Sequence, residues 1–337
     1  MRWLLTPAIA ASLFLAAASL FIAAIGEPPL ATLANLARYA FGDAYSLSES
    51  LVKAAPILFC ALAIILPARL GLISVGADGQ LYVGALFGTG IVLAVPGAPG
   101  VVLLPLMLAG GAVGGALFAA VPALLRARFA VNETITTLLL NYVGVLLVNF
   151  AVYGPWKDPA NLGWPATIAF PQGATVPGLF GTRAHWGLVL GVLLALTLFA
   201  VFGRGRVATR LLVLRENERV GRMMGLSFSR MVLVTMAIGG ALAGLAGIIE
   251  ASAIQGRLQP GLSLGYGLSG FLVAWLSGHN FLLAIPLSVL IGGLIAAGDT
   301  LQLFAKVPAS SVTVLLGILF AAMLAAAGLA GKLKKAA

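Results

Sequence analysis

The chain has 337 residues, of which 61% are hydrophobic and only 9% are charged, and its mean hydropathy is +1.08. Soluble globular domains carry about 25% charged residues, so this composition excludes a soluble protein and indicates an integral membrane protein. The net charge of +10 does not indicate a nucleic-acid-binding protein, because the Lys and Arg residues lie in short loops between apolar runs. The single cysteine, Cys60, lies within an apolar run and excludes a disulfide framework or a Cys-based metal site.

Apolar runs of about twenty residues predict an all-α polytopic membrane protein with ten transmembrane helices. We expect the spans at residues 3–25, 50–67, 71–95, 100–124, 131–153, 184–203, 231–252, 263–277, 280–300 and 307–330. The first is too long for the apolar core of a signal peptide and is interpreted as a retained span. Together the spans form a single transmembrane domain over residues 1–337. Gly-rich segments at 70–88 and 264–278 suggest an inverted repeat of spans 2–5 and 7–10.

The distribution of Lys and Arg predicts that both termini lie in the cytoplasm. With ten spans, fourteen of the twenty basic residues fall on the side of the termini, as the positive-inside rule requires. The outer side then holds the loops 26–49 and 154–183. Residues 28–45 have helical spacing and are expected to lie along the outer surface. The Pro-rich loop 154–183 either anchors aromatic residues at the interface or docks an external partner.

The loop over residues 204–230 is the one long charged segment, with seven arginines and two glutamates. Its charge places it in the cytoplasm. Asn217 can cap a short helix, apolar residues then recur at near-helical spacing, and Gly225 offers a stop. We therefore expect a short amphipathic helix that is presented to a partner.

The sequence contains no catalytic constellation and no phosphate-binding loop, so we expect a chain that is not an enzyme. Polar residues within the apolar runs are the candidates for function, because they are costly in a membrane. Asp78 and Gln80 lie where Gly76, Gly79 and Gly84 would let a helix break. They either line a solute path or satisfy the broken helix.

Two further groups of polar residues fall in or near the fifth span. Asn132 and Glu133 open that span, where a helix cap and a dipole partner are the simpler interpretation. Asn141 lies two turns deeper and is the better candidate for contact with a polar solute.

Glu250 lies near the outer end of its span and is expected to be solvated at the interface. The Gly240-x-x-x-Gly244 pattern predicts a close contact between helices.

Three blocks resemble the permease family of sugar-type and nucleoside-type ABC importers. The first is GLISVGADGQLYVGA (71–85), with Asp78 where the family usually has Glu. The second is NETITTLLLNYVGVLLVNFAVYGPWKDP (132–159), which is similar to the nucleoside-type branch in particular. The third, LRENERVGRMMGLSFSRMVLVTMAIGGALAGLAGIIE (214–250), is the most specific, although Arg215 stands where Gly is usual.

The resemblance implies a fold like that of the vitamin B12 importer permease and a location in the bacterial inner membrane. The loop after the sixth span would be the coupling helix, seated on a separate ATP-binding subunit that carries ATP and Mg²⁺, while this chain itself binds no cofactor. A second related permease, or a second copy, and an external solute-binding protein would complete the importer. The coupling residues would be Arg215, Glu216, Asn217, Glu218, Arg219, Gly221, Met223, Met224, Gly225 and Leu226.

The favoured function is therefore a nucleoside importer permease. The resemblance of block 132–159 to the nucleoside-type branch implies it, and the absence of a fixed charge pair in the spans suits an uncharged polar solute. A simple-sugar importer permease is the alternative within the same class. A secondary transporter that works without ATP is disfavoured, because no acidic relay is visible beyond Asp78. A membrane enzyme is also disfavoured, because the sequence contains no catalytic site.

Overall fold

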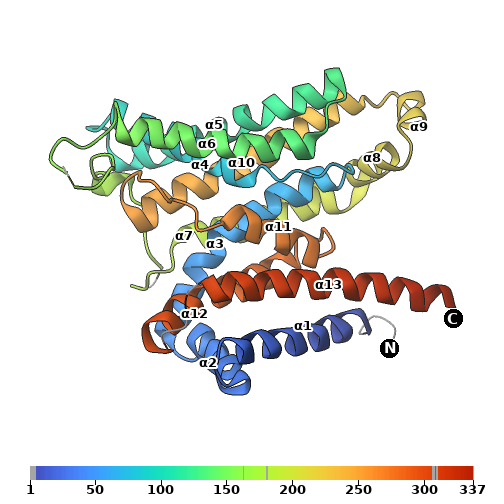
Figure 1. The fold of residues 1–337 in the computed structure, drawn as a ribbon. Helices are drawn as coiled ribbons and strands as arrows, with labels where there is room; N and C mark the ends of the chain where they lie inside the picture. The colour runs from blue at the N-terminus through green and yellow to red at the C-terminus, as the bar shows by residue number, and fades with distance from the viewer. Residues whose placement is uncertain (1–4, 162, 180, 306–307, 309, 337) are drawn as a thin grey trace. The chain divides into compact units, whose positions relative to one another are not determined.

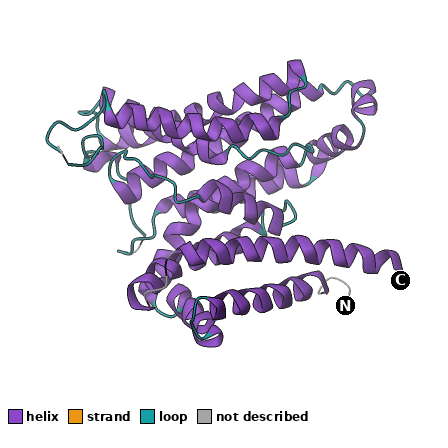
Figure 2. Cartoon of the chain, in the orientation of Figure 1, coloured by secondary structure: helices purple, strands orange, loops and turns teal. Residues whose placement is uncertain are grey.

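The computed structural model describes residues 5–161, 163–179, 181–305, 308 and 310–336. Among these residues there is no β-strand; Gly178 and His185 form an isolated bridge, and helices dominate (Figure 1, Figure 2). The predicted all-α class is confirmed. The chain divides into two compact units, Met1–Lys53 with Val289–Ala337, and Ala54–Ser288.

The first unit is built from the two ends of the chain. It contains the helices α1 (Leu5–Ala24), α2 (Pro29–Phe41) and α13 (Ser310–Ala336), the beginning of α3 (Ala44–Ala68) and the end of α12 (Ala284–Ala305). Its core joins residues from four of these helices: Ala18, Ile22, Leu36, Ala40, Ala297, Leu301, Val312 and Leu315. Lys53 and Asp299 form an ion pair of 3.7 Å at its surface. The predicted helix in residues 28–45 is present as α2.

The second unit contains the remaining helices. They are α4 (Ala77–Ala94), α5 (Gly100–Phe129), α6 (Glu133–Tyr153), α7 (Trp186–Leu198), α8 (Gly205–Glu216), α9 (Glu218–Met223), α10 (Phe228–Glu250) and α11 (Tyr266–Leu276), with π-helical turns η2 (Phe199–Gly203) and η3 (Ala251–Gln255) and a short 3-10 turn η1 (Gln172–Ala174). Helices α4, α5 and α10 pack on one another, and α6 packs on α4 (Figure 1).

Seven helices within the described residues are long and apolar enough to cross a membrane, or up to eight if the bent pair α1 and α2 counts as one span. This supports a multi-pass membrane protein, but it does not confirm the ten spans expected from the sequence. The eighth expected span, 263–277, contains only the eleven-residue helix α11. The third, 71–95, begins as helix only at Ala77.

Glycines allow the central helices to approach backbone to backbone. A Cβ atom at position 244 in α10 would collide with the carbonyl oxygen of Gly111 in α5, and one at position 240 would collide with that of Gly115. Because only glycine fits at such a contact, α10 and α5 can lie closer than side chains would permit. The close contact predicted for Gly240-x-x-x-Gly244 is confirmed. Gly79 and Gly84, expected to break a helix, instead lie inside α4 at close contacts.

Glu250 differs from its expected place at a solvated interface. It ends α10, and only 4% of its surface is exposed. One carboxylate oxygen accepts a hydrogen bond of 3.3 Å from the hydroxyl of Tyr266. The expectation was wrong because this end of α10 is buried, with the side chain of Tyr266 in α11 against the Glu250 carboxylate.

Candidate functional site

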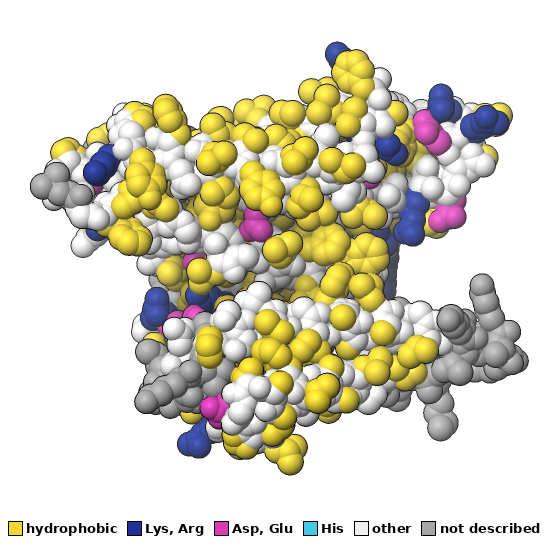
Figure 3. All heavy atoms as spheres, in the orientation of Figure 1, with side chains coloured by type: hydrophobic (Ala, Val, Ile, Leu, Met, Phe, Trp, Pro, Cys, Tyr) yellow, Lys and Arg dark blue, Asp and Glu magenta, His cyan; other side chains and the backbone are white. Residues whose placement is uncertain are grey.

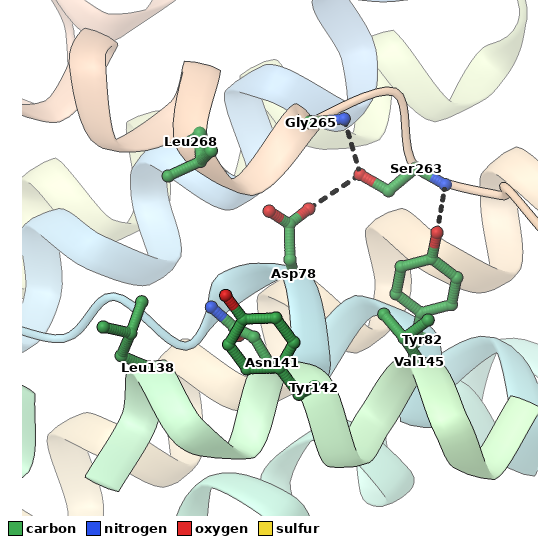
Figure 4. Close-up of a pocket in the computed structure, with 9 residues that line it drawn as sticks. All are labelled: Asp78, Tyr82, Leu138, Asn141, Tyr142, Val145, Ser263, Gly265 and Leu268. Carbon is green, nitrogen blue, oxygen red and sulfur yellow. Dashed lines mark hydrogen bonds between the residues drawn. The ribbon is translucent and has the colours of Figure 1, made fainter. Parts of the chain in front are cut away.

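A pocket of about 280 Å³ lies in the second unit between α4, α6 and the segment that leads into α11 (Figure 4). Its lining residues are Asp78, Tyr82, Leu138, Asn141, Tyr142, Val145, Ser263, Gly265 and Leu268. Asp78 and Tyr82 are four residues apart on α4, and the α6 residues recur at spacings of three and four, so each helix presents one face to the pocket.

The carboxylate of Asp78 is the acidic group of this pocket. Its Oδ1 atom accepts hydrogen bonds from the hydroxyl of Ser263 at 2.7 Å and from the backbone N–H of Gly267 at 2.9 Å. Gly267 lies in the first turn of α11, where backbone N–H groups lack partners within the helix and favour a negative charge. Asp78 therefore holds the beginning of α11 as well as lining the pocket. Asp78 thus lines the pocket and has a structural role, while its place on a solute path stays a prediction.

Ser263 connects the groups around Asp78. Its hydroxyl accepts hydrogen bonds from the N–H groups of Gly265 at 3.2 Å and Tyr266 at 3.0 Å, and its own N–H donates to the hydroxyl of Tyr82 at 3.2 Å. Gly265 has φ +83°, a left-handed conformation that glycine adopts without strain. The turn before α11 is thereby fixed against the face of α4 that carries Asp78.

Asn141 lines the pocket but uses both ends of its amide on backbone groups. The side-chain oxygen accepts from the N–H of Gly79 at 2.8 Å, and the side-chain NH₂ donates to the carbonyl of Val75 at 2.8 Å. The sequence placed Asn141 deep in its span, and the structure brings it beside Asp78. Its amide orients the beginning of α4.

The other candidates for the solute path lie outside the lining of this pocket. Asn132 caps α6, because its side-chain oxygen accepts from the N–H groups of Thr134 and Ile135. Glu133 is buried; it accepts from the N–H of Ile73 at 3.2 Å and pairs with Nε of Arg126 at 3.3 Å. Gln80 is buried in α4 and also lies outside the lining.

Sequence reasoning did not select Tyr82, Tyr142 or Ser263. The two tyrosines carried a usable signal, since Tyr82 follows Asp78 by one helical turn and Tyr142 follows Asn141 directly. Ser263 carried none, because 185 residues separate it from its partner Asp78.

The charged loop predicted at 204–230 forms two helices rather than one. Helix α8 ends at Glu216, and Asn217 caps α9 by accepting hydrogen bonds from the N–H groups of Arg219 and Val220. Gly225 has φ +78° and follows Met224, the C-cap of α9, so the predicted cap and stop are both confirmed. The predicted coupling residues are thus divided: Arg215 and Glu216 end α8, and those from Glu218 to Met223 form α9.

The surface of this loop combines positive charge with exposed methionines. Met223 is 87% exposed and Met224 64% exposed, while Glu218 and Arg222 pair across one turn at 3.0 Å. Figure 3 shows Lys and Arg side chains gathered where α8 and α9 lie, beside the hydrophobic surface of the helices. Flexible, exposed methionines suit contact with another protein. Leu226 instead packs inward against the cluster of buried residues around Leu214.

Comparison with known proteins places these features in a transport family. Residues 46–331 match the family described as the permease component of the branched-chain amino acid transport system. The chain is 31% identical over 322 residues to the glucose ABC transporter permease protein of Haloferax volcanii, covering 92% of this chain and 84% of that protein.

Two nucleoside-related permeases are also similar along most of their length. The guanosine ABC transporter permease protein of Bacillus subtilis is 28% identical, covering 98% of this chain and 97% of that protein. The nucleoside ABC transporter permease protein of Lactococcus lactis is 25% identical, covering 87% of this chain and 82% of that protein.

Proposed function

We propose a solute and a set of partners for this chain, which belongs to the family of permease components of the branched-chain amino acid transport system. It is a multi-pass permease component of an ABC transporter, and the proposal is that it imports nucleosides. The observation that carries the proposal is the pocket, in which one carboxylate and two tyrosines lie together. Its volume of about 280 Å³ is just below the lower bound of about 300 Å³ for small-molecule sites, so it suits a small solute such as a nucleoside.

The groups in the pocket favour an uncharged ring compound with hydrogen-bond donors. The Asp78 carboxylate accepts two hydrogen bonds through Oδ1, and a carboxylate offers about four acceptor positions in all, so it can also accept from a ribose hydroxyl or a base N–H. Tyr82 and Tyr142 offer aromatic surface for a planar base. The guanosine permease that aligns with nearly the whole chain supports the same choice.

A simple sugar is the alternative solute, and the glucose permease of 31% identity favours it. Competition for uptake separates the two. Membrane vesicles that contain the transporter should take up labelled guanosine in an ATP-dependent manner, and excess adenosine should compete more strongly than excess glucose or ribose. Competition by glucose and not by nucleosides would assign the sugar.

A separate ATP-binding subunit, which carries ATP and Mg²⁺, is proposed to seat on the α8–α9 loop. Exposed Met223 and Met224 next to a positively charged surface support such a contact. This chain binds no cofactor in the proposal. Uptake that persists without ATP but is lost when the proton gradient collapses would instead indicate a secondary transporter.

A second permease, either related or identical, is proposed to cover the outward face of α6. Tyr142 at the pocket is 69% exposed, and large apolar residues such as Leu139, Leu146 and Phe150 are exposed on the same helix. A pocket with an acidic group that opened directly to hydrocarbon would be costly, whereas a protein neighbour can enclose it. An external solute-binding protein, an inner-membrane location and cytoplasmic termini complete the proposal.

The partners are tested by purifying the tagged chain in mild detergent and identifying the co-purified proteins by mass spectrometry. An ATP-binding subunit, a second permease and a solute-binding protein support the proposed assembly. A chain that purifies alone and remains active in vesicles without ATP would contradict it.

A further inference from the structure

Between α3 and α4 the chain runs without helix over residues 69–76, although the flanking segments are helical. Backbone groups in such a stretch need partners from elsewhere when water is excluded. One face of α6 supplies them. The N–H of Ile73 donates to Glu133 and the N–H of Val75 donates to the hydroxyl of Thr137 at 3.1 Å.

The carbonyl groups of the same stretch are satisfied from the same helix face. The carbonyl of Ile73 accepts from the hydroxyl of Thr134 at 2.9 Å, and that of Val75 accepts from the amide of Asn141 at 2.8 Å. Asn141 also accepts from the N–H of Gly79, so it binds both sides of the beginning of α4. Residues 73–75 are therefore held by side chains of α6, whereas the N–H groups of residues 69–72 donate to backbone carbonyls at the end of α3.

The beginning of this stretch lies against α8. Leu70 and Leu72 belong to one buried cluster with Leu211 and Leu214 of α8. At Gly71, which has φ +85°, a Cβ atom would lie 3.2 Å from Cγ of Arg215. Any displacement of α8 therefore acts directly on residues 70–72, because buried side chains in contact transmit strain.

The end of the stretch leads into the pocket. Gly76 precedes α4 and lies against Thr137, and Asp78 follows in the first turn. Only seven positions of chain separate Gly71, beside α8, from Asp78, beside the solute pocket. A short extended segment that is anchored at several points can move as a unit between two arrangements.

We infer that Thr137 and Asn141 are positioning residues that hold residues 72–76 in place. These residues then connect α8 to the pocket, so that movement of α8 changes the position of the Asp78 carboxylate. This inference rests on the proposed function, in which α8 and α9 receive the movement of an ATP-binding subunit. Thr137 is the more informative of the two, because it lies outside the lining of the pocket. Its hydroxyl also donates to the carbonyl of Glu133, so one hydroxyl joins α6 to the segment.

The test uses the purified full transporter complex in vesicles with labelled guanosine, and three variants of the permease. Thr137→Val keeps the side-chain shape but leaves the N–H of Val75 without an acceptor. Thr137→Ser restores the hydroxyl. Thr136→Val is the matched control, because the hydroxyl of Thr136 donates to the carbonyls of Asn132 and Glu133, at the cap and the first residue of its own helix.

We expect Thr137→Val to lower the number of solute molecules transported per ATP hydrolysed by roughly tenfold, while basal ATP hydrolysis remains. Thr137→Ser should return the ratio close to that of the native protein, and Thr136→Val should leave it unchanged. If Thr137 had a purely structural role, Thr137→Val would instead lower the yield of the complex, its transport activity and its ATP hydrolysis together. Equal ratios for Thr137→Val and Thr136→Val would overturn the inference.

Hydrogen exchange provides a second measurement on the native complex. ATP binding should change the exchange of the amides of Ile73, Val75 and Gly79, which donate to side chains of α6. Exchange at these amides that is the same with and without ATP would overturn the inference. The two proposals fail in different ways. Native vesicles without ATP-dependent uptake would contradict the proposed function, whereas normal uptake with an unaffected Thr137→Val variant would contradict the connection alone.

Discussion

The carboxylate of Asp78 accepts a hydrogen bond of 2.7 Å from the hydroxyl of Ser263, although 185 residues separate the two in sequence. This bond joins the beginning of α4 to the turn that starts α11. Asp78 was a candidate from the sequence because an acidic residue within an apolar run is costly. The structure shows that the protein itself already satisfies part of this carboxylate, and that the pocket lies beside it.

The first prediction concerns recognition by this carboxylate. Asp78→Asn should weaken guanosine binding by roughly tenfold or more, because a hydrogen bond to a charged group contributes about 1.5–3 kcal/mol. Equilibrium binding of labelled guanosine to the purified complex measures the change. Asp299→Asn is the control, since Asp299 is also acidic but lies at the surface in a pair with Lys53. Native affinity in the Asp78 variant would return this residue to a structural role.

The second prediction concerns the exposed end of α9. Met224→Asp should lower ATP-driven uptake at least about tenfold, because a charge without a partner at a buried protein interface costs several kcal/mol. Met224→Leu keeps the apolar contact and should retain uptake. Both variants should insert in the membrane at native levels, because Met224 is exposed in this chain. Normal uptake by Met224→Asp would show that the ATP-binding subunit docks elsewhere.

The third prediction concerns the close contact of α5 and α10. Gly244→Ala places a methyl group against the backbone of Gly111 and should destabilise the protein by about 1–3 kcal/mol. The midpoint of thermal unfolding in detergent measures the effect. Gly317→Ala is the matched helical control, because no atom of the described residues lies within 4 Å of a Cβ atom at that position. The interpretation fails if both variants unfold at the same temperature.

The fourth prediction is a loss of stability in acid. His185 is 2% exposed, and burial lowers its pKa from 6.5 to about 4. The unfolded chain therefore binds a proton between about pH 6.5 and pH 4 that the folded chain does not. The free energy of unfolding should accordingly fall as the pH is lowered through this range, by at most about 1.4 kcal/mol per pH unit.

The variant His185→Leu should remove most of this pH dependence, as measured by thermal unfolding at pH 7.5 and pH 5. His279→Leu is the comparison. The pKa of His279 is also lowered, by burial first and then by the positive charges of Arg215 and Arg69. If the native protein and His185→Leu lose stability equally between these pH values, another group is responsible.

The sequence by itself determined the features that depend on neighbouring residues. The apolar runs established a helical membrane protein, because backbone hydrogen bonds in hydrocarbon must be satisfied within the chain. The arginine-rich loop, the cap at Asn217 and the stop at Gly225 were local signals, and the structure confirms the cap and the stop. The glycines of α10 likewise predicted a close contact from their spacing alone.

Only the tertiary structure decided where the helices break and which polar groups meet. Residues 71–76 are apolar enough to have been included in a span, but side chains of α6 about sixty residues away bond to the backbone of Ile73 and Val75 and allow this part of the chain to remain without helix. The pairing of Asp78 with Ser263 also depends on segments distant in sequence. A local sequence pattern indicates that a segment requires a hydrogen-bond acceptor or an apolar neighbour. Which residue supplies it depends on how the whole unit packs.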